Sequence, residues 1–190
     1  MQSLQLSRPH AIMMVGIPGS GKSFFAEQFA ETFNAPYIDS LVLEEHSRDE
    51  RAAGELIGFV LGELTKTKSS FVFEGNSDSR VRRTEFAAWA RNKGYVPLFI
   101  WVQVDMATAL SRSVRSGSMS KDDFQQALKG FSAPHESEKA IVISGKHTYA
   151  SQAKVVLKKL GAMNRPATQS TAAPRPVAVP SERRPVQIRS

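Results

Sequence analysis

Residues 16–23 of the chain read Gly-Ile-Pro-Gly-Ser-Gly-Lys-Ser, a complete G-x-x-x-x-G-K-[S/T] phosphate-binding loop. Residues 11–15, directly before it, read Ala-Ile-Met-Met-Val, an uninterrupted apolar run typical of a buried parallel strand. After the loop, apolar side chains recur at a helical spacing as far as residue 34, at Phe25, Ala26, Phe29, Ala30 and Phe33. Strand, glycine-rich loop and helix form the context that such a loop requires. The sequence therefore predicts that a nucleoside triphosphate binds here.

Each residue type in this loop has a chemical role. The glycines let successive backbone N–H groups turn inward and form a nest for an anion, and the N-terminus of the following helix adds partial positive charge. Lys22 is expected to reach the β- and γ-phosphates, and the Ser23 hydroxyl to ligate magnesium. The predicted nucleotide-binding residues are Gly16, Ile17, Pro18, Gly19, Ser20, Gly21, Lys22 and Ser23, with ATP and Mg²⁺ as cofactors.

Length and composition limit the class of protein. The 190 residues have room for one α/β domain and an appendage. No apolar run approaches the ~20 residues of a membrane helix, and we expect no secretory signal at the N-terminus and no membrane partner. The chain has no cysteine, which excludes disulfides, zinc–thiolate sites and thiol catalysis. Together with ATP dependence, this composition favours the cytoplasm.

The net charge of +7 is concentrated near the C-terminus. Residues 161–190 contain five arginines and one glutamate, which account for +4 and leave +3 for residues 1–160. They also hold five of the ten prolines and no aromatic residue. This composition predicts a disordered basic tail after a folded domain of residues 1–160. A non-specific contact with nucleic acid is one role open to such a tail.

The rest of the domain alternates strands with helices, which predicts a mainly parallel sheet covered by helices on both faces. Further strands are expected near 35–39, 71–74, 95–104 and 140–143, and helices near 48–66, 79–92, 105–115, 120–129 and 149–160. Ligands of such sheets bind at the carboxyl ends of the strands.

Two carboxylates lie at predicted strand ends. Asp39 follows the second strand, where it can accept a proton from an attacking hydroxyl, or else cap the next segment. Glu74 ends the third strand and can hold magnesium or orient a hydroxyl, provided that this strand lies beside the first. Asn76, two residues later, either hydrogen-bonds a substrate or accepts a strained turn conformation. Asp39 is the expected general base, with Glu74 as the alternative.

Basic residues supply the remaining candidates. Arg112 and Arg115 share one face of the helix after the fourth strand, and residues 116–138 can form a lid that brings guanidinium groups to the transferred phosphate. Three arginines, Arg80, Arg82 and Arg83, begin a helix at its unfavourable end for cations, which suggests an anionic substrate or a surface salt-bridge network. His147, after the fifth strand, is expected to line the adenine pocket or to face solvent.

Over residues 10–160 the chain resembles P-loop kinases of the polynucleotide kinase type. The zeta-toxin-like and chloramphenicol phosphotransferase-like kinases are relatives of that type, within the wider group of ATP-binding proteins with an AAA domain. The resemblance implies a five-stranded parallel sheet in the order 2-3-1-4-5 with a small helical lid. It also implies that Asp39 is the general base, that Glu74-Gly75-Asn76 and Arg82-Arg83 form the acceptor segment, and that Arg112 and Arg115 are lid arginines. Two departures, Glu at position 74 and no arginine after Asp39, argue against a polynucleotide substrate.

The sequence thus predicts a magnesium- and ATP-dependent kinase that transfers the γ-phosphate to a hydroxyl group. The acceptor is a nucleic-acid 5′ end or a small molecule. Two alternatives remain: a small-molecule kinase of the toxin or antibiotic-resistance type, and a non-catalytic, ATP-gated binding module.

Overall fold

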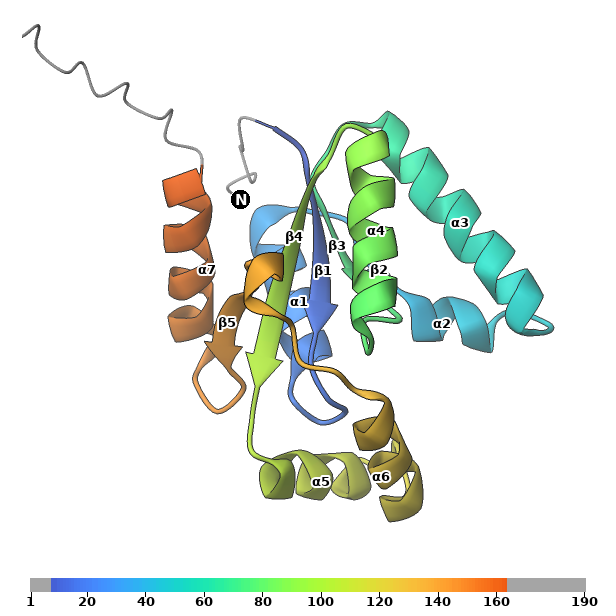
Figure 1. Ribbon diagram of the computed structural model, residues 1–190, viewed down its shortest axis with the longest axis vertical. Coiled ribbons are helices and arrows are strands. Elements are labelled where there is room, and N and C mark those ends of the chain that lie inside the picture. Colours follow the sequence, from blue (N-terminus) through green and yellow to red (C-terminus); the bar gives the residue numbers. More distant parts are fainter. Residues whose placement is uncertain (1–7, 164–190) are drawn as a thin grey trace, which may run out of the picture.

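The apolar run before the phosphate loop forms the central strand of a five-stranded sheet with the order β2-β3-β1-β4-β5. β1 (His10–Val15) pairs with β3 (Phe71–Glu74) on one side and with β4 (Val96–Gln103) on the other. β2 (Tyr37–Asp39) and β5 (Ile141–Ser144) are the edge strands. All four pairings are parallel, so the carboxyl ends of the strands point the same way (Figure 1). The predicted sheet and its order are confirmed.

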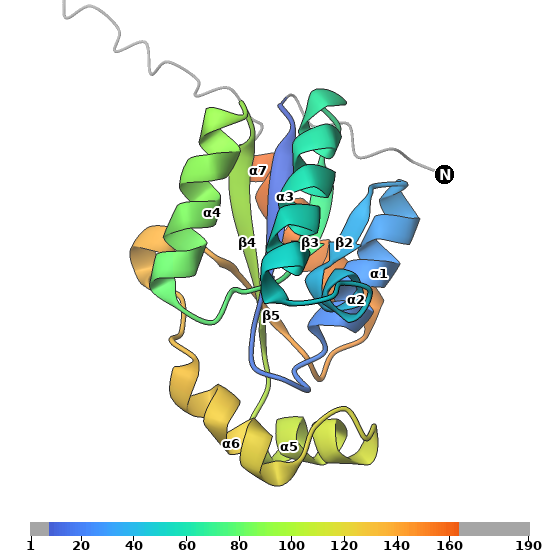
Figure 2. The same cartoon turned by 90° about the vertical axis from the view of Figure 1, so that its right-hand side faces the viewer.

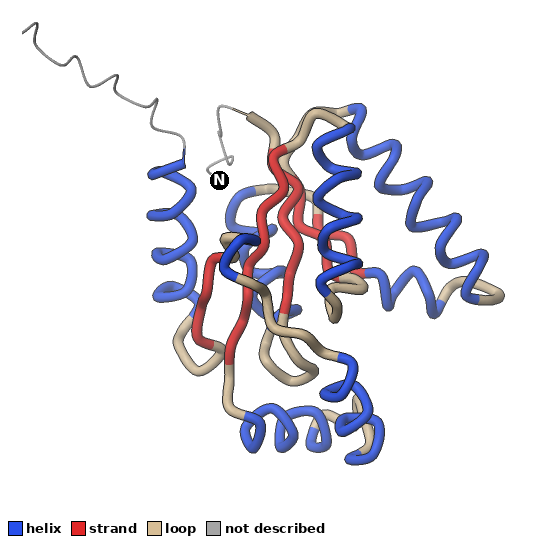
Figure 3. The backbone as a smooth tube through the Cα atoms, viewed as in Figure 1, coloured by secondary structure: helices blue, strands red, loops and turns tan. Residues whose placement is uncertain are grey.

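The computed structural model describes residues 8–163, and within this range seven α-helices connect or follow the strands (Figure 3). Their bounds are α1 (Lys22–Phe33), α2 (Ser40–Glu45), α3 (Glu50–Lys66), α4 (Arg80–Asn92), α5 (Met106–Arg115), α6 (Lys121–Gly130) and α7 (Tyr149–Met163), with a short 3₁₀ helix, η1 (Glu136–Glu138), before β5. No described helix is both long and apolar enough to span a membrane.

Alternating side chains of β1 divide the core between the two faces of the sheet. Ile12 and Met14 pack with Phe25 and Phe29 of α1 and with Val156 and Leu160 of α7. Ala11, Met13 and Val15 point to the other face, which packs against α3 and α4. Both faces are therefore covered, which is why β1 reads as a continuous apolar run. Figure 2 shows α1 and α7 on one side of the sheet, with α3 and α4 on the other.

Helices α5 and α6 lie beyond the carboxyl ends of β1 and β4 (Figures 1 and 2). Asp105 caps α5 by accepting a hydrogen bond from the backbone N–H of Thr108, and Ser120 caps α6 through that of Asp123. The two caps fix where α5 and α6 begin. Of these two helices, α6 falls within residues 116–138, the predicted lid, and α5 precedes it.

Three details differ from the expected elements. A helix not predicted, α2, follows β2 directly because Asp39 caps it through the backbone N–H of Leu41 at 2.9 Å. The 3₁₀ helix η1 was not predicted either. The last helix continues to Met163, three residues past its expected end at 160. The rest of the predicted tail, residues 164–190, lies outside the described residues.

Candidate functional site

The phosphate loop owes its shape to three glycines with positive φ angles. Gly16, Gly19 and Gly21 have φ of 151°, 71° and 97°, a region that residues with a side chain rarely adopt. Space is also restricted: a Cβ on Gly19 would lie 2.2 Å from the carbonyl oxygen of Ala109 in α5. The conformation and the close approach of α5 both require glycine, so the loop backbone is available to cradle an anion.

Lys22 and Ser23 meet Glu74 at the start of α1. The Lys22 Nζ lies 3.8 Å from Glu74 Oε1 and donates a hydrogen bond to the Ile17 carbonyl oxygen at 3.3 Å. The Ser23 hydroxyl donates to Glu74 Oε1 at 3.0 Å. The parallel pairing of β1 with β3 is what brings Glu74 here. A hydroxyl and a carboxylate oxygen are hard ligands suited to magnesium, so this pair of residues fits the metal that the motif implies.

Tyr37 links Glu74 to Asp39. Its hydroxyl donates to Glu74 Oε2 at 2.9 Å and lies 3.4 Å from Asp39 Oδ2. The three residues adjoin because β2 pairs with β3 in a register that sets Asp39 opposite Glu74. Asp39 Oδ1 accepts the backbone N–H of Leu41, so the residue caps α2 and still presents its second oxygen to the site. The cap predicted for Asp39 is thus present, and its role as general base stays a prediction.

Burial perturbs the charges of this cluster. Desolvation lowers the pKa of the Lys22 ammonium, against the attraction of Glu74 and Asp39. Desolvation also raises the pKa of Glu74, against Lys22 and the hydroxyls of Tyr37 and Ser23. The pKa of Tyr37 is raised by desolvation and by the two neighbouring carboxylates, so it remains a hydrogen-bond donor. Burying charged groups in this way is unfavourable unless they are paired, and the contacts among Lys22, Ser23, Tyr37 and Glu74 supply that pairing.

A cavity of about 350 Å³ opens over these residues. Its lining combines Lys22 of the phosphate loop, Asp39 and Glu74 at the strand ends, the loop of residues 75–78, and the C-terminal part of α6 with Phe131. Asn76 lines this cavity and has an exposed side chain. The cavity is the place where a second substrate can approach the phosphate loop.

A larger cavity of about 560 Å³ lies beyond Ile17, between the ends of β4 and β5. Lys146 and Asp105 line it and form an ion pair with Nζ and Oδ2 2.5 Å apart. His147 has an exposed side chain and is not among the lining residues. Of the two positions expected for His147, the described geometry corresponds to the solvent-facing one.

The two predicted lid arginines are placed differently. Arg112 is exposed and its Nη1 donates to the Gly145 carbonyl oxygen at 3.0 Å, so it joins α5 to the loop after β5. A Cβ on Gly21 would lie 3.9 Å from the same Nη1, which puts this guanidinium beside the phosphate loop. Arg115 is also exposed, but it donates to Ser111 Oγ on its own helix at 3.3 Å. Arg112 alone of the pair contacts the loops that flank the nucleotide site.

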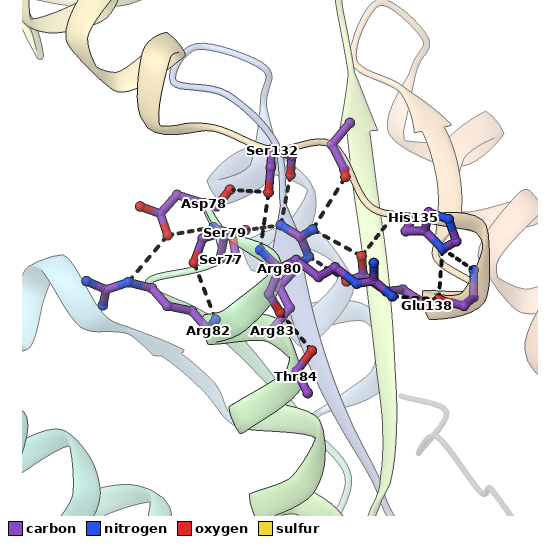
Figure 4. Close-up of polar contacts among 12 residues, drawn as sticks. Ser77, Asp78, Ser79, Arg80, Arg82, Arg83, Thr84, Ser132, His135 and Glu138 are labelled. Carbon is purple, nitrogen blue, oxygen red and sulfur yellow. Dashed lines mark hydrogen bonds and ion pairs between the residues drawn. The ribbon is translucent and has the colours of Figure 1, made fainter.

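The three arginines of α4 point in separate directions (Figure 4). Arg82 is half-exposed and pairs with Asp78 at 3.5 Å. Arg80 reaches the opposite way, donating to Ser137 Oγ at 3.3 Å. Arg83 is fully buried, with its guanidinium occupied by Glu138 and by backbone carbonyls. The prediction that Arg83 contacts a substrate needs correction, because its side chain is fully buried and its donors are taken by protein acceptors.

Two residues of the site were missed. Tyr37 lies in the second strand and carries no local signal of a partner, since Glu74 is 37 residues away in sequence. Glu138 pairs with Arg83 across 55 residues and lies in a segment with no helical or strand periodicity. A buried arginine cannot be told from an exposed one by the α4 sequence alone, although its position in an apolar stripe with Phe86 and Ala87 is compatible with burial.

A comparison with protein-family models and with curated protein sequences finds no match. Solved structures do match. A gluconokinase from Sinorhizobium meliloti 1021 is 17% identical at a TM-score of 0.63, over 82% of this chain and 94% of that one. A sugar kinase from Janibacter sp. HTCC2649 is 15% identical at 0.63, over 81% and 95%.

Kti12 from Chaetomium thermophilum, solved with ADP-AlF3, is also 15% identical at a TM-score of 0.63, over 80% of this chain and 98% of that one. These identities are too low to transfer a substrate. They show that the chain has the fold of P-loop kinases, over nearly the whole length of each neighbour.

Proposed function

We propose that the protein is an ATP-dependent kinase that transfers the γ-phosphoryl group to a hydroxyl of a small molecule. One observation carries the proposal: Lys22 of the phosphate loop and the carboxylates of Asp39 and Glu74 all line a single cavity of about 350 Å³. The Ser23 hydroxyl adjoins that cavity through its hydrogen bond to Glu74. Phosphoryl transfer depends mainly on positioning and charge neutralisation, which this arrangement supplies. The kinase neighbours in fold support the same class of reaction.

Each side chain has a role in the proposed reaction. Lys22 binds the β- and γ-phosphates, replacing its present contacts with the Ile17 carbonyl and Glu74. Ser23 and Glu74 would hold magnesium, which neutralises charge on the phosphates when bound. Arg112, beside the phosphate loop, stabilises negative charge that builds up on the transferred group.

The two carboxylates divide the work of metal binding and proton transfer. Glu74 already accepts hydrogen bonds from Ser23 and Tyr37 and faces Lys22, so its oxygens are engaged. Among the described residues, Asp39 Oδ2 has one hydrogen bond, from the Tyr37 hydroxyl at 3.4 Å. Asp39 is thus the better general base. It takes the proton of the acceptor hydroxyl as that oxygen bonds to the γ-phosphorus and the bond from phosphorus to the bridging β–γ oxygen breaks.

The charge of the cavity favours an uncharged or cationic acceptor. Four carboxylates line it, Asp39, Glu44, Glu74 and Asp78, against the ammonium of Lys22. A nucleic-acid end or a sugar acid would bring further negative charge into this space. A neutral polyol, sugar or aminosugar fits better, which favours a small-molecule kinase over a polynucleotide kinase.

The test is transfer of labelled γ-phosphate from ATP to a panel of acceptors grouped by charge: neutral sugars and polyols, aminosugars, sugar acids, and oligonucleotides with a free 5′ hydroxyl. We expect transfer to the first two groups, and none by Lys22→Ala, whose side chain does not contribute to the core. Lys154→Ala is the matched control, because Lys154 is exposed on α7.

Preferred transfer to oligonucleotides would refute the assignment of the acceptor. Tight, Lys22-dependent ATP binding with no transfer to any group would favour instead a binding module gated by ATP.

A further inference from the structure

Arg83 is a buried cation that joins two segments distant in sequence, the loop that ends at its own helix and residues 132–138. Its Nε and Nη2 donate to the two carboxylate oxygens of Glu138 at 2.7 and 3.1 Å. Its Nη1 donates to the carbonyl oxygens of Ser77 and Ser132, each at 2.9 Å (Figure 4). Glu138 also accepts the backbone N–H of His135 at 2.7 Å, which fixes the segment after α6. A single guanidinium therefore holds the loop after β3 and the chain that returns from the lid.

The two segments that Arg83 joins each contribute to the wall of the 350 Å³ cavity. Ser77 and Asp78 belong to one segment, and Phe131, which precedes Ser132, adjoins the other. Backbone hydrogen bonds reinforce the joint: the Ser132 N–H donates to the Asp78 carbonyl oxygen at 2.8 Å. Arg83 itself does not line the cavity. Its hydrogen bonds to Ser77 and Ser132 hold the two wall segments together from outside the cavity.

Stability alone does not account for this choice of residues. Replacing a buried ion pair with apolar side chains of similar size often leaves the free energy of unfolding unchanged or increases it. The stability of the fold therefore does not require an ion pair at this position. The guanidinium differs in offering rigidly arranged donors to several acceptors at once, and this arrangement fixes relative position.

We propose that Arg83, paired with Glu138, is a positioning residue that sets the width of the acceptor cavity by locking the end of the lid to the loop of residues 75–79. The description of the cavity as the acceptor site rests on the proposed function; the lock between its walls does not. The lid then pivots on a fixed C-terminal end.

The absence of cysteine from the chain permits a direct measurement. Nitroxide labels at Asn76→Cys and Gln125→Cys, both exposed positions, report the distance between the cavity wall and α6. Pulsed electron paramagnetic resonance is recorded on the full chain, with and without Mg·ADP, in three backgrounds: the native pair, Arg83→Met/Glu138→Leu, and Arg51→Met/Glu55→Leu. The last is the matched control, because Arg51 and Glu55 form an exposed pair on α3.

In Arg83→Met/Glu138→Leu we expect the distance distribution to broaden and its mean to lengthen, with ADP affinity unchanged. The control variant keeps the native distribution. Hydrogen exchange of the Ser132 amide accelerates by at least about tenfold, the effect of losing one charge-assisted hydrogen bond. A folded double variant with the native distribution overturns the proposal.

Should the double variant fail to fold, Glu138→Gln, which keeps the shape and loses the charge, is measured in its place. A smaller broadening in the same direction supports the proposal, and an unchanged distribution overturns it. No phosphoryl transfer is needed for these readouts, so they stand apart from the outcome of the acceptor panel.

Discussion

Replacing Gly145 by alanine tests how tightly the loop after β5 packs on the phosphate loop. A Cβ at this position would lie 2.1 Å from the carbonyl oxygen of Ser20, whereas real Cβ contacts stay beyond 3.0 Å. Ser20 is completely buried, and the atom that the new Cβ would overlap is its backbone carbonyl oxygen. Gly145 is itself held, since its N–H donates to the Gln103 carbonyl oxygen at 2.7 Å and its own carbonyl accepts from Arg112. The strain must therefore be shared between the two loops.

Overpacking of this kind costs about 1–3 kcal/mol. Where the strain falls on the fold, the melting temperature drops by roughly 2–4 °C for each kcal/mol in a domain of this size. Where it falls on the phosphate loop, the Kd for Mg·ADP rises by roughly 5- to 150-fold. We expect both effects in Gly145→Ala, measured by calorimetry and thermal denaturation.

Gly62→Ala is the matched control, because a Cβ there meets no atom within 4 Å. Since Gly62 lies in the interior of α3, alanine should stabilise the protein by about 0.5–1 kcal/mol without changing ADP affinity. Native stability and native affinity in Gly145→Ala would refute the packing argument.

Three further predictions concern the charged groups. Asp39→Asn keeps the cap of α2, since asparagine caps equally well, but it should lower kcat by roughly 10²–10⁴-fold with ATP affinity unchanged; a native kcat would make Glu74 the base. Arg112→Ala should lower kcat by on the order of 10³-fold and Arg115→Ala by much less, and equal, small losses in steady-state assays would argue against a catalytic arginine. Burial raises the pKa of Glu74 from its ordinary value of 4.5. Between the unfolded and the folded pKa, the folded state therefore binds more protons than the unfolded state. The stability from Glu74 is complete below pH ~4.5 and is lost as pH rises through its folded pKa. Urea denaturation should show the unfolding free energy of the native protein increasing relative to Glu74→Gln as pH falls, and a pH-independent difference would contradict this.

The sheet was predictable because its strands carry their signals locally. β1, β3 and β4 are apolar runs bounded by turns, and the phosphate loop marks the junction of β1 with α1. The strand order came from the resemblance, and the pairings confirm it. Helix α2 could not be predicted because its six residues make too few turns to show a helical repeat of apolar side chains.

Contacts between residues far apart in the chain could not be predicted from the sequence. The role of Arg83 depends on Glu138, Ser77 and Ser132, which only the folded chain brings together. The charge run at the start of α4 suggested an anionic substrate or a surface salt-bridge network, and two of its three arginines, Arg82 and Arg83, pair with protein carboxylates. The sequence of α4 could not identify Glu138 as the partner of Arg83, because it carries no information on which distant segment packs against the first turn of the helix.

The pairing of β1 has a consequence for synthesis on the ribosome. β1 is complete after residue 15, yet its neighbours are Phe71–Phe73 on one side and Val96–Trp101 on the other. The growing chain must therefore extend more than eighty residues past this strand before both of its edges are filled. Until then, an apolar segment with unpaired backbone groups is exposed, which is the type of segment that aggregates. The phosphate loop is among the first parts of the domain to be made, and the strand that precedes it needs protection until residues 96–101 have been made.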